Sequence, residues 1–141
     1  MFLDKLCKTN PDLIQIAVHM HQQKQILPDT YVVDVDRFLE NAKAILQKAN
    51  EQNIELYYML KQIGRNPYLA KELEKIGYKG AVVVDFKEAE VMMKNRLHIA
   101  HAGHLVQIPS MMINQLVAYG CDYITVYSYE KLVEVNEAAK K

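Results

Sequence analysis

The chain alternates short apolar runs with segments in which apolar residues recur every three or four positions. Four runs have the composition of buried strands, although histidines interrupt the third: 54–60, 80–84, 97–102 and 122–126. Each is followed by a helical pattern, and these helices begin near Pro67, Phe86, Pro109 and Tyr129. Strands that are apolar on both faces and joined by helices predict a parallel sheet covered by helices.

The first part of the chain predicts helices and one strand. Asn10 and Pro11 are good N-cap and first-turn residues for a helix that runs to about Lys24. A break at 27–30 is followed by a β-branched run, 31–35, which predicts a strand. A further helix then begins at Asp36, which we expect to cap it. The sequence therefore predicts a helical extension over residues 1–30, followed by a domain over 31–141.

A faint internal repeat supports repeated strand–helix units. The segments 77–86 and 120–129 both run from a glycine through an apolar strand to an N-cap residue and an aromatic residue, although any two such units look alike. Repeated units favour a (β/α)8 TIM barrel or a doubly wound sheet. A barrel needs roughly 250 residues, so we expect the first half of one: four strand–helix units plus the leading helix and strand. A small open sheet is the alternative. The end of the sequence inside a helical pattern suggests a truncated chain, although natural helices also end this way.

Composition excludes several classes of protein. Half of the residues are apolar, which is ample for a packed core, and seventeen acidic residues balance seventeen basic ones. This charge balance argues against a nucleic-acid partner. No apolar run reaches the ~18 residues of a membrane span, and the N-terminus becomes charged too early for a secretory signal. Cys7 and Cys121 could form one disulfide, but two distant cysteines fit a reduced cytoplasmic protein better.

Lys61 is the first candidate for chemistry. It follows the apolar run 56–60, at the carboxyl end of a predicted strand, which is where parallel sheets bind ligands. Apolar surroundings would disfavour its ammonium form and supply the neutral amine that a Schiff base needs. A lysine that extends its ammonium group into water is the alternative.

Arg65 is the second candidate. Asn66 caps a helix that Pro67 begins, so the N–H groups of that helix end lie beside a guanidinium group. This combination suits a phosphate or a carboxylate, and an ordinary cap beside a solvated arginine is the alternative. No nucleotide-binding glycine motif is present.

Three histidines, His98, His101 and His104, form the third candidate. Zinc is disfavoured because residues 98 and 101 would point to opposite faces of a strand and no acid or cysteine stands near them in sequence. We therefore predict no metal site, and expect His101 or His104 to reach the edge that carries Lys61. Packing and capping are the alternatives. Asp85, in the pattern Asp85-x-x-Glu88, is explained by helix capping.

Several of these motifs resemble the alanine racemase family, which consists of pyridoxal-phosphate enzymes with a (β/α)8 barrel. The run 33–36, a helix with Glu40-Asn41 and a strand ending in Lys61 are similar to the start of that barrel, and 80–89 is similar to its second strand. The stretches 55–67 and 103–109 resemble the YhfX-like branch of pyridoxal-phosphate-binding proteins. The resemblance implies a Schiff-base role for Lys61. Arg65 lies where alanine racemases carry a phosphate-binding tyrosine, so its contact with the phosphate rests on its charge.

The resemblance implies a function as well as a fold. We expect the N-terminal part of a racemase-like enzyme that uses pyridoxal 5′-phosphate on an amino acid or amine and forms a homo-oligomer. Lys61 would be catalytic, and Lys61, Arg65 and His104 would bind the cofactor. The alternatives are a non-catalytic cofactor carrier or regulator, and a complete small α/β binding module without a cofactor.

Overall fold

The chain consists of two units, residues 1–38 and 39–141, and the computed structural model describes residues 2–141. In the first unit, α1 (Phe2–Thr9) precedes α2 (Pro11–Gln22). Asn10 caps α2 by accepting the N–H of Leu13 at 3.2 Å, so the predicted helix and cap are confirmed. No residue of α2 is buried. The helix α1 was not predicted from the sequence.

The predicted strand 31–35 is wrong. Residues 31–34 pair with no strand, and Tyr31 is 87% exposed. A β-branched run has the composition of a strand but becomes one only where a neighbouring backbone satisfies its hydrogen bonds. The expected cap Asp36 is also wrong: α3 (Val35–Asn50) begins one residue earlier, and Asp34 accepts the N–H of Arg37 at 3.0 Å.

The second unit holds a parallel sheet of three strands in the order β1 (Ala81–Val82), β2 (Ile99–Ala102) and β3 (Cys121–Ile124). Both strand pairs are parallel, as predicted. The predicted first strand, 54–60, is wrong as a full strand, because it forms only an isolated parallel bridge from Tyr58 to Ala81. The N–H of Tyr58 donates to Gly80 at 3.0 Å, and the N–H of Val82 donates back to Tyr58 at 2.8 Å.

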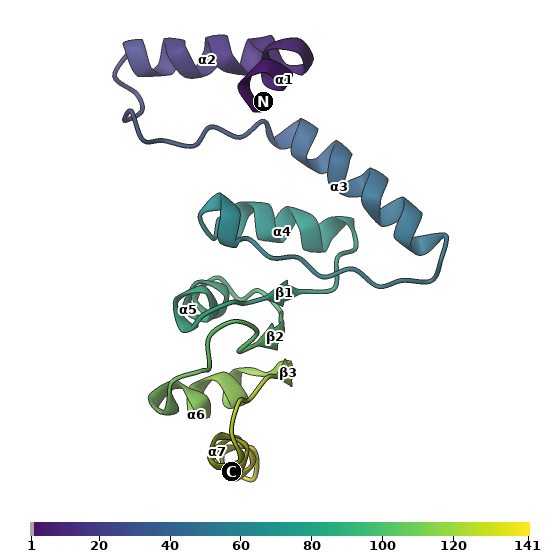
Figure 1. Cartoon of the computed structure of the whole chain (residues 1–141), viewed down its shortest axis with the longest axis vertical. Coiled ribbons are helices and arrows are strands. Elements are labelled where there is room, and N and C mark those ends of the chain that lie inside the picture. The colour runs from purple at the N-terminus through teal and green to yellow at the C-terminus, as the bar shows by residue number, and fades with distance from the viewer. Residues whose placement is uncertain (1) are drawn as a thin grey trace. The chain divides into compact units, whose positions relative to one another are not determined.

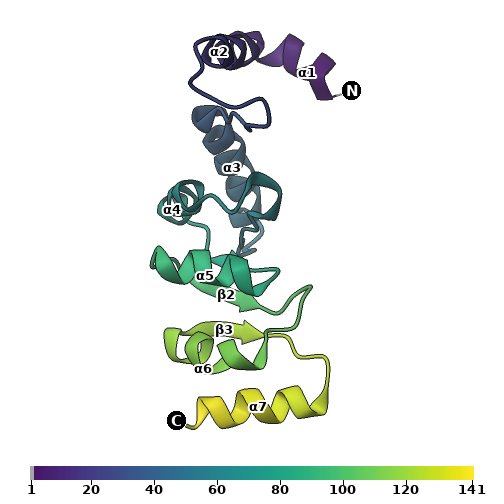
Figure 2. The same ribbon diagram turned by 90° about the vertical axis from the view of Figure 1, so that its left-hand side faces the viewer.

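Helices follow the strands in the predicted alternation. Their bounds are α4 (Pro67–Ile76), α5 (Phe86–Lys94), α6 (Ser110–Tyr119) and α7 (Tyr129–Ala139). Figure 1 shows α5 and α6 on the same side of the sheet. Figure 2, viewed from that side, shows α5 in front of β2 and α6 in front of β3.

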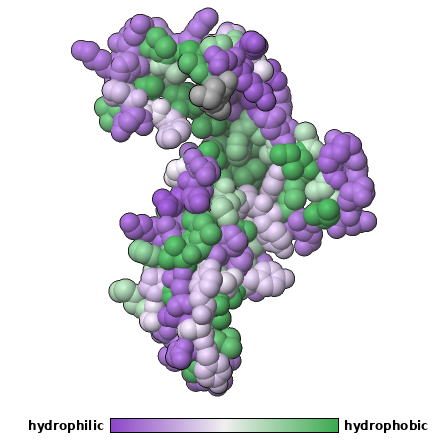
Figure 3. Space-filling view, viewed as in Figure 1, coloured by the Kyte–Doolittle hydropathy of each residue, from purple (hydrophilic) through white to green (hydrophobic). Residues whose placement is uncertain are grey.

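The core is formed by the sheet together with α4, α5 and α6, whereas α7 contributes no buried residue. It is formed by residues that are at most 2% exposed, among them Leu69, Val83, Met92, Ile99 and Leu116. Each large side chain of this kind contributes roughly 1.5–3 kcal/mol through burial. Apolar side chains also remain on the surface, and Figure 3 shows green and purple areas interspersed on the face seen in Figure 1. No helix within residues 2–141 is long and apolar enough to cross a membrane.

The repeat noted in the sequence is present as matched helix ends. Gly77 ends α4 and Gly120 ends α6. Asp85 caps α5 by accepting the N–H of Glu88 at 2.8 Å, and Ser128 caps α7 through the N–H of Lys131 at 3.2 Å. These local signals fix where the helices start and stop, and the two N-caps fix where the loops at the carboxyl ends of β1 and β3 end.

Replacing the cap of α4 should destabilise the protein. Asn66 Oδ1 accepts the N–H of Tyr68 at 2.9 Å and that of Leu69 at 3.3 Å. We expect Asn66→Ala to lower the free energy of unfolding by about 1 kcal/mol in urea titrations, because both donors lose their partner. Asn66→Asp, which keeps an acceptor at the same place, is the control and should lose much less. An alanine variant as stable as the wild type would show that solvent satisfies these groups equally well.

Candidate functional site

Parallel strands bring their carboxyl ends to one edge of the sheet, and the loops at this edge carry the candidate residues. We call these loops, together with the 3-10 helix at 61–63 and the first turn of α5, the rim and define it as residues 61–66, 85–88, 103–109 and 125–128. Ligands of parallel α/β proteins bind at this edge because backbone groups and helix N-termini meet there. All the site residues predicted from the sequence, Lys61, Arg65 and His104, lie on the rim.

Lys61 opens a short 3-10 helix, Lys61–Ile63, directly after Leu60. Leu60 is only 3% exposed, whereas Lys61 is exposed. The apolar strand end thus supports the lysine without enclosing it, so the desolvation expected from the sequence is not provided by this chain. Among residues 2–141, Lys61 Nζ makes no hydrogen bond or ion pair. Its amino group is therefore available to a ligand.

The turn after Lys61 has an uncommon backbone. Gly64 and Arg65 both lie in the left-handed region, with φ of 71° and 56°. The N–H of Arg65 donates a hydrogen bond to the carbonyl of Leu60 at 3.0 Å, and this bond closes the turn. A left-handed conformation costs an ordinary residue about 1–2 kcal/mol, so contacts of the Arg65 side chain must stabilise it.

One such contact is an ion pair with Asp85. Arg65 NH2 lies 2.9 Å from Asp85 Oδ2, and the two side chains are 34% and 22% exposed. The other carboxylate oxygen of Asp85 caps α5. Asp85 therefore does more than the capping role predicted from the sequence, because it also joins the first rim loop to the second.

Glu88 is buried next to this pair. It is 1% exposed, and Val84 donates its N–H to Oε2 at 2.6 Å. Burial raises the pKa of Glu88, while the Val84 N–H and the charges of Arg65 and Lys61 lower it. Two buried side-chain atoms in residues 2–141 have no hydrogen-bond partner, and both belong to this cluster: Glu88 Oε1 and Arg65 Nε.

A second cluster of polar side chains lies at the carboxyl ends of β2 and β3. His101 Nε2 is 2.7 Å from Thr125 Oγ1, and the rings of His101 and His104 meet edge to face with centroids 5.6 Å apart. His104 is exposed, and its carbonyl accepts the hydroxyl of Tyr127 at 2.6 Å. Of these two histidines, His104 lies on the rim, whereas His101 lies within β2 and reaches the rim only through its bond to Thr125.

The structure does not join the two groups directly. Within residues 2–141, no hydrogen bond or ion pair links Lys61 or Arg65 to His104. His98 lies apart from the other histidines because it precedes β2, and its Nε2 is 2.8 Å from Asp122 Oδ2. In the part of the chain that is described, no three His, Cys, Asp or Glu residues are placed to hold a metal ion.

The environment of His101 predicts a pH dependence of stability. Burial, and then the charge of His104, lowers the pKa of His101. Between this lowered value and the ordinary value near 6.5, unfolded His101 binds more proton than folded His101, so stability falls as the pH falls. We expect the free energy of unfolding to drop more between pH 8 and pH 5 in the wild type than in His101→Gln, measured in urea.

A control separates this effect from other titrating groups. The raised pKa of Glu88 acts in the opposite sense, since the folded carboxyl binds its proton more tightly. Because Glu88 is present in both proteins, the difference between wild type and His101→Gln isolates His101. Equal pH dependence in wild type and His101→Gln would contradict the prediction.

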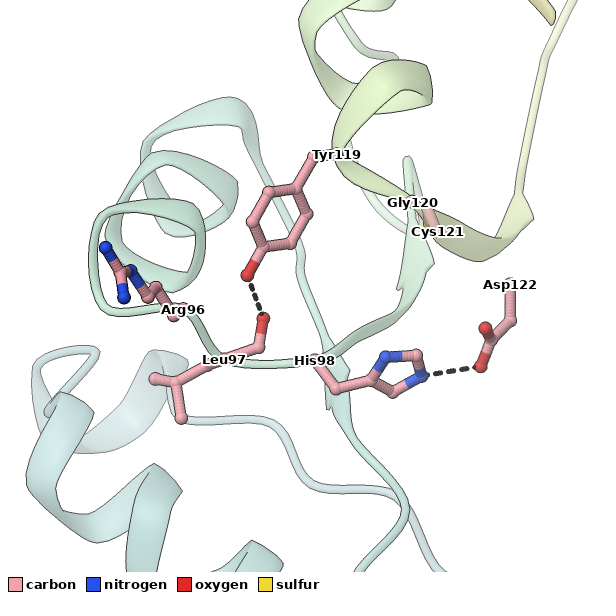
Figure 4. A pocket seen from close by; sticks show the side chains of 7 residues that line it. All are labelled: Arg96, Leu97, His98, Tyr119, Gly120, Cys121 and Asp122. Atoms are coloured by element: carbon pink, nitrogen blue, oxygen red, sulfur yellow. Dashed lines mark hydrogen bonds and ion pairs between the residues drawn. The ribbon is translucent and has the colours of Figure 1, made fainter.

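An open pocket of about 500 Å³ lies at the opposite end of the strands. Figure 4 shows its lining, in which the Tyr119 hydroxyl donates to the carbonyl of Leu97 at 2.7 Å and the ring of His98 faces Asp122. Residues at the amino ends of parallel strands usually serve stability. We therefore place the candidate site on the rim rather than in this pocket.

Sequence reasoning missed the partners of the predicted residues. Glu88 carried a signal, since an acid three residues after Asp85 marks a capping box, but nothing in the pattern showed that it is buried. The pairing of Arg65 with Asp85 spans 20 residues and has no local signature. Thr125 lies within the predicted strand 122–126 and gave no signal of its bond to His101.

Comparison with known proteins shows the class of fold. The crystal structure of D-threonine aldolase from Filomicrobium marinum matches 77% of this chain with a TM-score of 0.66, at 20% sequence identity and over 30% of the aldolase chain. The chain is thus a mixed α/β fold with a small parallel sheet that is also found within that enzyme. Over all 141 residues it is 49% identical to the uncharacterized protein YhfX of Escherichia coli (strain K12), and it spans 36% of that protein. No family model matches the chain.

Proposed function

We propose that this chain is part of a pyridoxal-phosphate-dependent enzyme that acts on an amino acid or a related amine, with Lys61 as its Schiff-base residue. The observation that carries the proposal is the Lys61 amino group, which has no partner within residues 2–141 and lies at the carboxyl end of an apolar segment that pairs in parallel with β1. The motifs similar to the alanine racemase family support it. So does the shared fold with D-threonine aldolase, whose name assigns it an amino acid as substrate.

The proposal extends to the architecture. We propose the first half of a (β/α)8 barrel over residues 31–141, preceded by a helical extension over 1–30. Three parallel strands in chain order and a fourth parallel segment at Tyr58 support this arrangement. Because the chain spans 36% of YhfX, the activity belongs to a longer protein. We also propose that this protein forms a homo-oligomer.

The rim residues fit the aldehyde group of the cofactor better than its phosphate group. A free primary amine suits its aldehyde, and this is what Lys61 offers. Arg65 and His104 are the residues we propose to contact it further, Arg65 through charge on its phosphate. The NH2 group of Arg65 is already paired with Asp85. The N–H groups of Tyr68 and Leu69 at the start of α4 already donate to Asn66. This chain alone thus provides a weak phosphate site, as expected where such barrels bind phosphate at later strands.

Lys61 would perform two tasks. Its Nζ, as the neutral amine, would hold the cofactor covalently at the aldehyde carbon, and water would be the leaving group of that condensation. When bound, pyridoxal phosphate supplies an electron-withdrawing ring that stabilises negative charge on a substrate carbon. When it is not bonded to the cofactor, Lys61 Nζ would take or return a proton at the substrate α-carbon.

Chemical trapping tests the proposal. The longest natural protein that contains these 141 residues is incubated with pyridoxal phosphate, reduced with borohydride and digested, and the modified lysine is located by mass spectrometry. We expect the pyridoxyl group on Lys61. Modification mainly at Lys87, Lys94 or another lysine would overturn the site and the mechanism built on it.

A further inference from the structure

Glu88 occupies a place where an acidic side chain is costly. Val84 follows β1, and its N–H is not part of the ladder, whose last bond runs from the Val83 N–H to His101 at 2.8 Å. Glu88 Oε2 accepts this N–H. A glutamine would satisfy the same donor without a buried charge, so the second oxygen and the charge of Glu88 need a separate explanation.

The unpaired atoms of the cluster complement each other. Glu88 Oε1 is an acceptor without a donor, and Arg65 Nε is a donor without an acceptor, and both are buried. Among the charged side chains that influence Glu88, namely Arg65, Asp85 and Lys61, Arg65 acts most strongly. A buried polar group without a hydrogen-bond partner is destabilising. A pairing of these two atoms, directly or through one water, removes both costs.

We propose that Glu88 is a positioning residue of the Lys61 site, whose carboxylate takes the Nε–H of Arg65 while Asp85 takes NH2. Two carboxylates then hold one guanidinium group, as its planar fork of donors allows. Arg65 is fixed in its left-handed conformation, which closes the turn that carries Lys61. When all four groups are ionised, Lys61, Arg65, Asp85 and Glu88 balance in charge.

This inference rests on the proposed function only in taking Lys61 as the Schiff-base residue. The proposed pairing involves only residues of this chain, and it predicts a dependence on pH. Protonation of Glu88 removes the charge that holds Arg65 Nε, and the groups that face Glu88 are Arg65, Asp85 and Lys61. The burial that raises the pKa of Glu88 brings this transition closer to neutral pH.

Nuclear magnetic resonance of the 141-residue chain tests the pairing. We expect the Arg65 15Nε shift and the Glu88 13Cδ shift to titrate with one common midpoint. In Glu88→Gln, hydrogen exchange at Arg65 Nε should become about tenfold faster, the factor expected for losing a hydrogen bond to a charged group. Glu137→Gln removes an exposed carboxylate that pairs with Lys140 on α7, and it should leave this exchange unchanged.

Different results would overturn the pairing, the positioning role and the proposed function. Independent titration of the two residues overturns the pairing in the unmodified chain, even if Glu88→Gln does not fold. Where Glu88→Gln folds, Arg65 exchange as slow as in the wild type also overturns it. In borohydride trapping, the Lys61 share of modification should fall about tenfold relative to Lys87 in Glu88→Gln. If the Lys61 share of modification is unchanged in Glu88→Gln, the positioning role is overturned but the Arg65 pairing is not. If Lys61 is not modified in the wild type, the proposed function is overturned, and the Arg65 pairing is then judged from the magnetic resonance data.

Discussion

Lys61→Ala should lose all specific covalent capture of pyridoxal phosphate, while the protein remains folded. Lys61 is exposed and makes no hydrogen bond or ion pair within residues 2–141, so its truncation should change the free energy of unfolding by no more than about 0.5 kcal/mol. The loss of capture follows because the amine that forms the bond is absent. The measurements are borohydride trapping with peptide mapping, and urea unfolding of the same preparations.

Lys61→Arg should fail as completely as Lys61→Ala. A guanidinium group keeps the charge and the length of the side chain but stays protonated, so it has no free electron pair for an aldehyde. Lys87→Ala, which removes an exposed lysine from the first turn of α5, is the matched control and should retain capture at Lys61. Capture that survives in both Lys61 variants would show that another residue carries the reaction.

Lys61→Arg is informative because it separates a requirement for positive charge from a requirement for a nucleophile. Arg65 is engaged by Asp85, and His101 by Thr125, so both are held within the protein. Lys61 alone among the predicted residues offers an unengaged primary amine on the rim. A positive charge that merely attracts phosphate could be replaced by arginine, whereas a nucleophile could not.

The sequence was sufficient for the elements that are fixed by local interactions. Asn66 and Pro67 at one end and Gly77 at the other define α4, because a cap and a left-handed terminator act within a few residues. The alternation of β1 to β3 with helices also followed from apolar runs separated by helical periodicities. These features need no knowledge of distant parts of the chain.

The features that failed depend on partners elsewhere in the chain. The run 31–35 has strand composition, but residues 31–34 have no neighbouring strand. The run 54–60 meets its neighbour only around Tyr58, so most of it does not join the sheet. The contacts of the candidate site likewise depend on residues that are distant in the sequence. The position of Lys61 at a strand end was visible in the pattern, whereas the charges around it come together through loops 20 residues apart.

The rim around His101 depends on one glycine, which predicts a large effect on stability. Gly103 has φ of 80°, and a β-carbon there would lie 2.5 Å from the carbonyl oxygen of Thr125. That contact is with backbone, which cannot rotate away. The N–H of Thr125 donates to the carbonyl of Ala102 at 2.9 Å, so a displaced Thr125 weakens the end of the β2–β3 pair and the bond to His101.

We therefore expect Gly103→Ala to lower the free energy of unfolding by roughly 2–5 kcal/mol, the sum of a left-handed alanine and an overpacked site. The measurement is urea unfolding at constant pH. Gly64→Ala is the matched control, since Gly64 has a similar φ of 71° but nothing within 4 Å of its β-carbon position. It should lose only the conformational cost of about 1–2 kcal/mol. If Gly103→Ala is no less stable than Gly64→Ala, the close approach of Thr125 is not a constraint on the fold, and the rim can shift without loss.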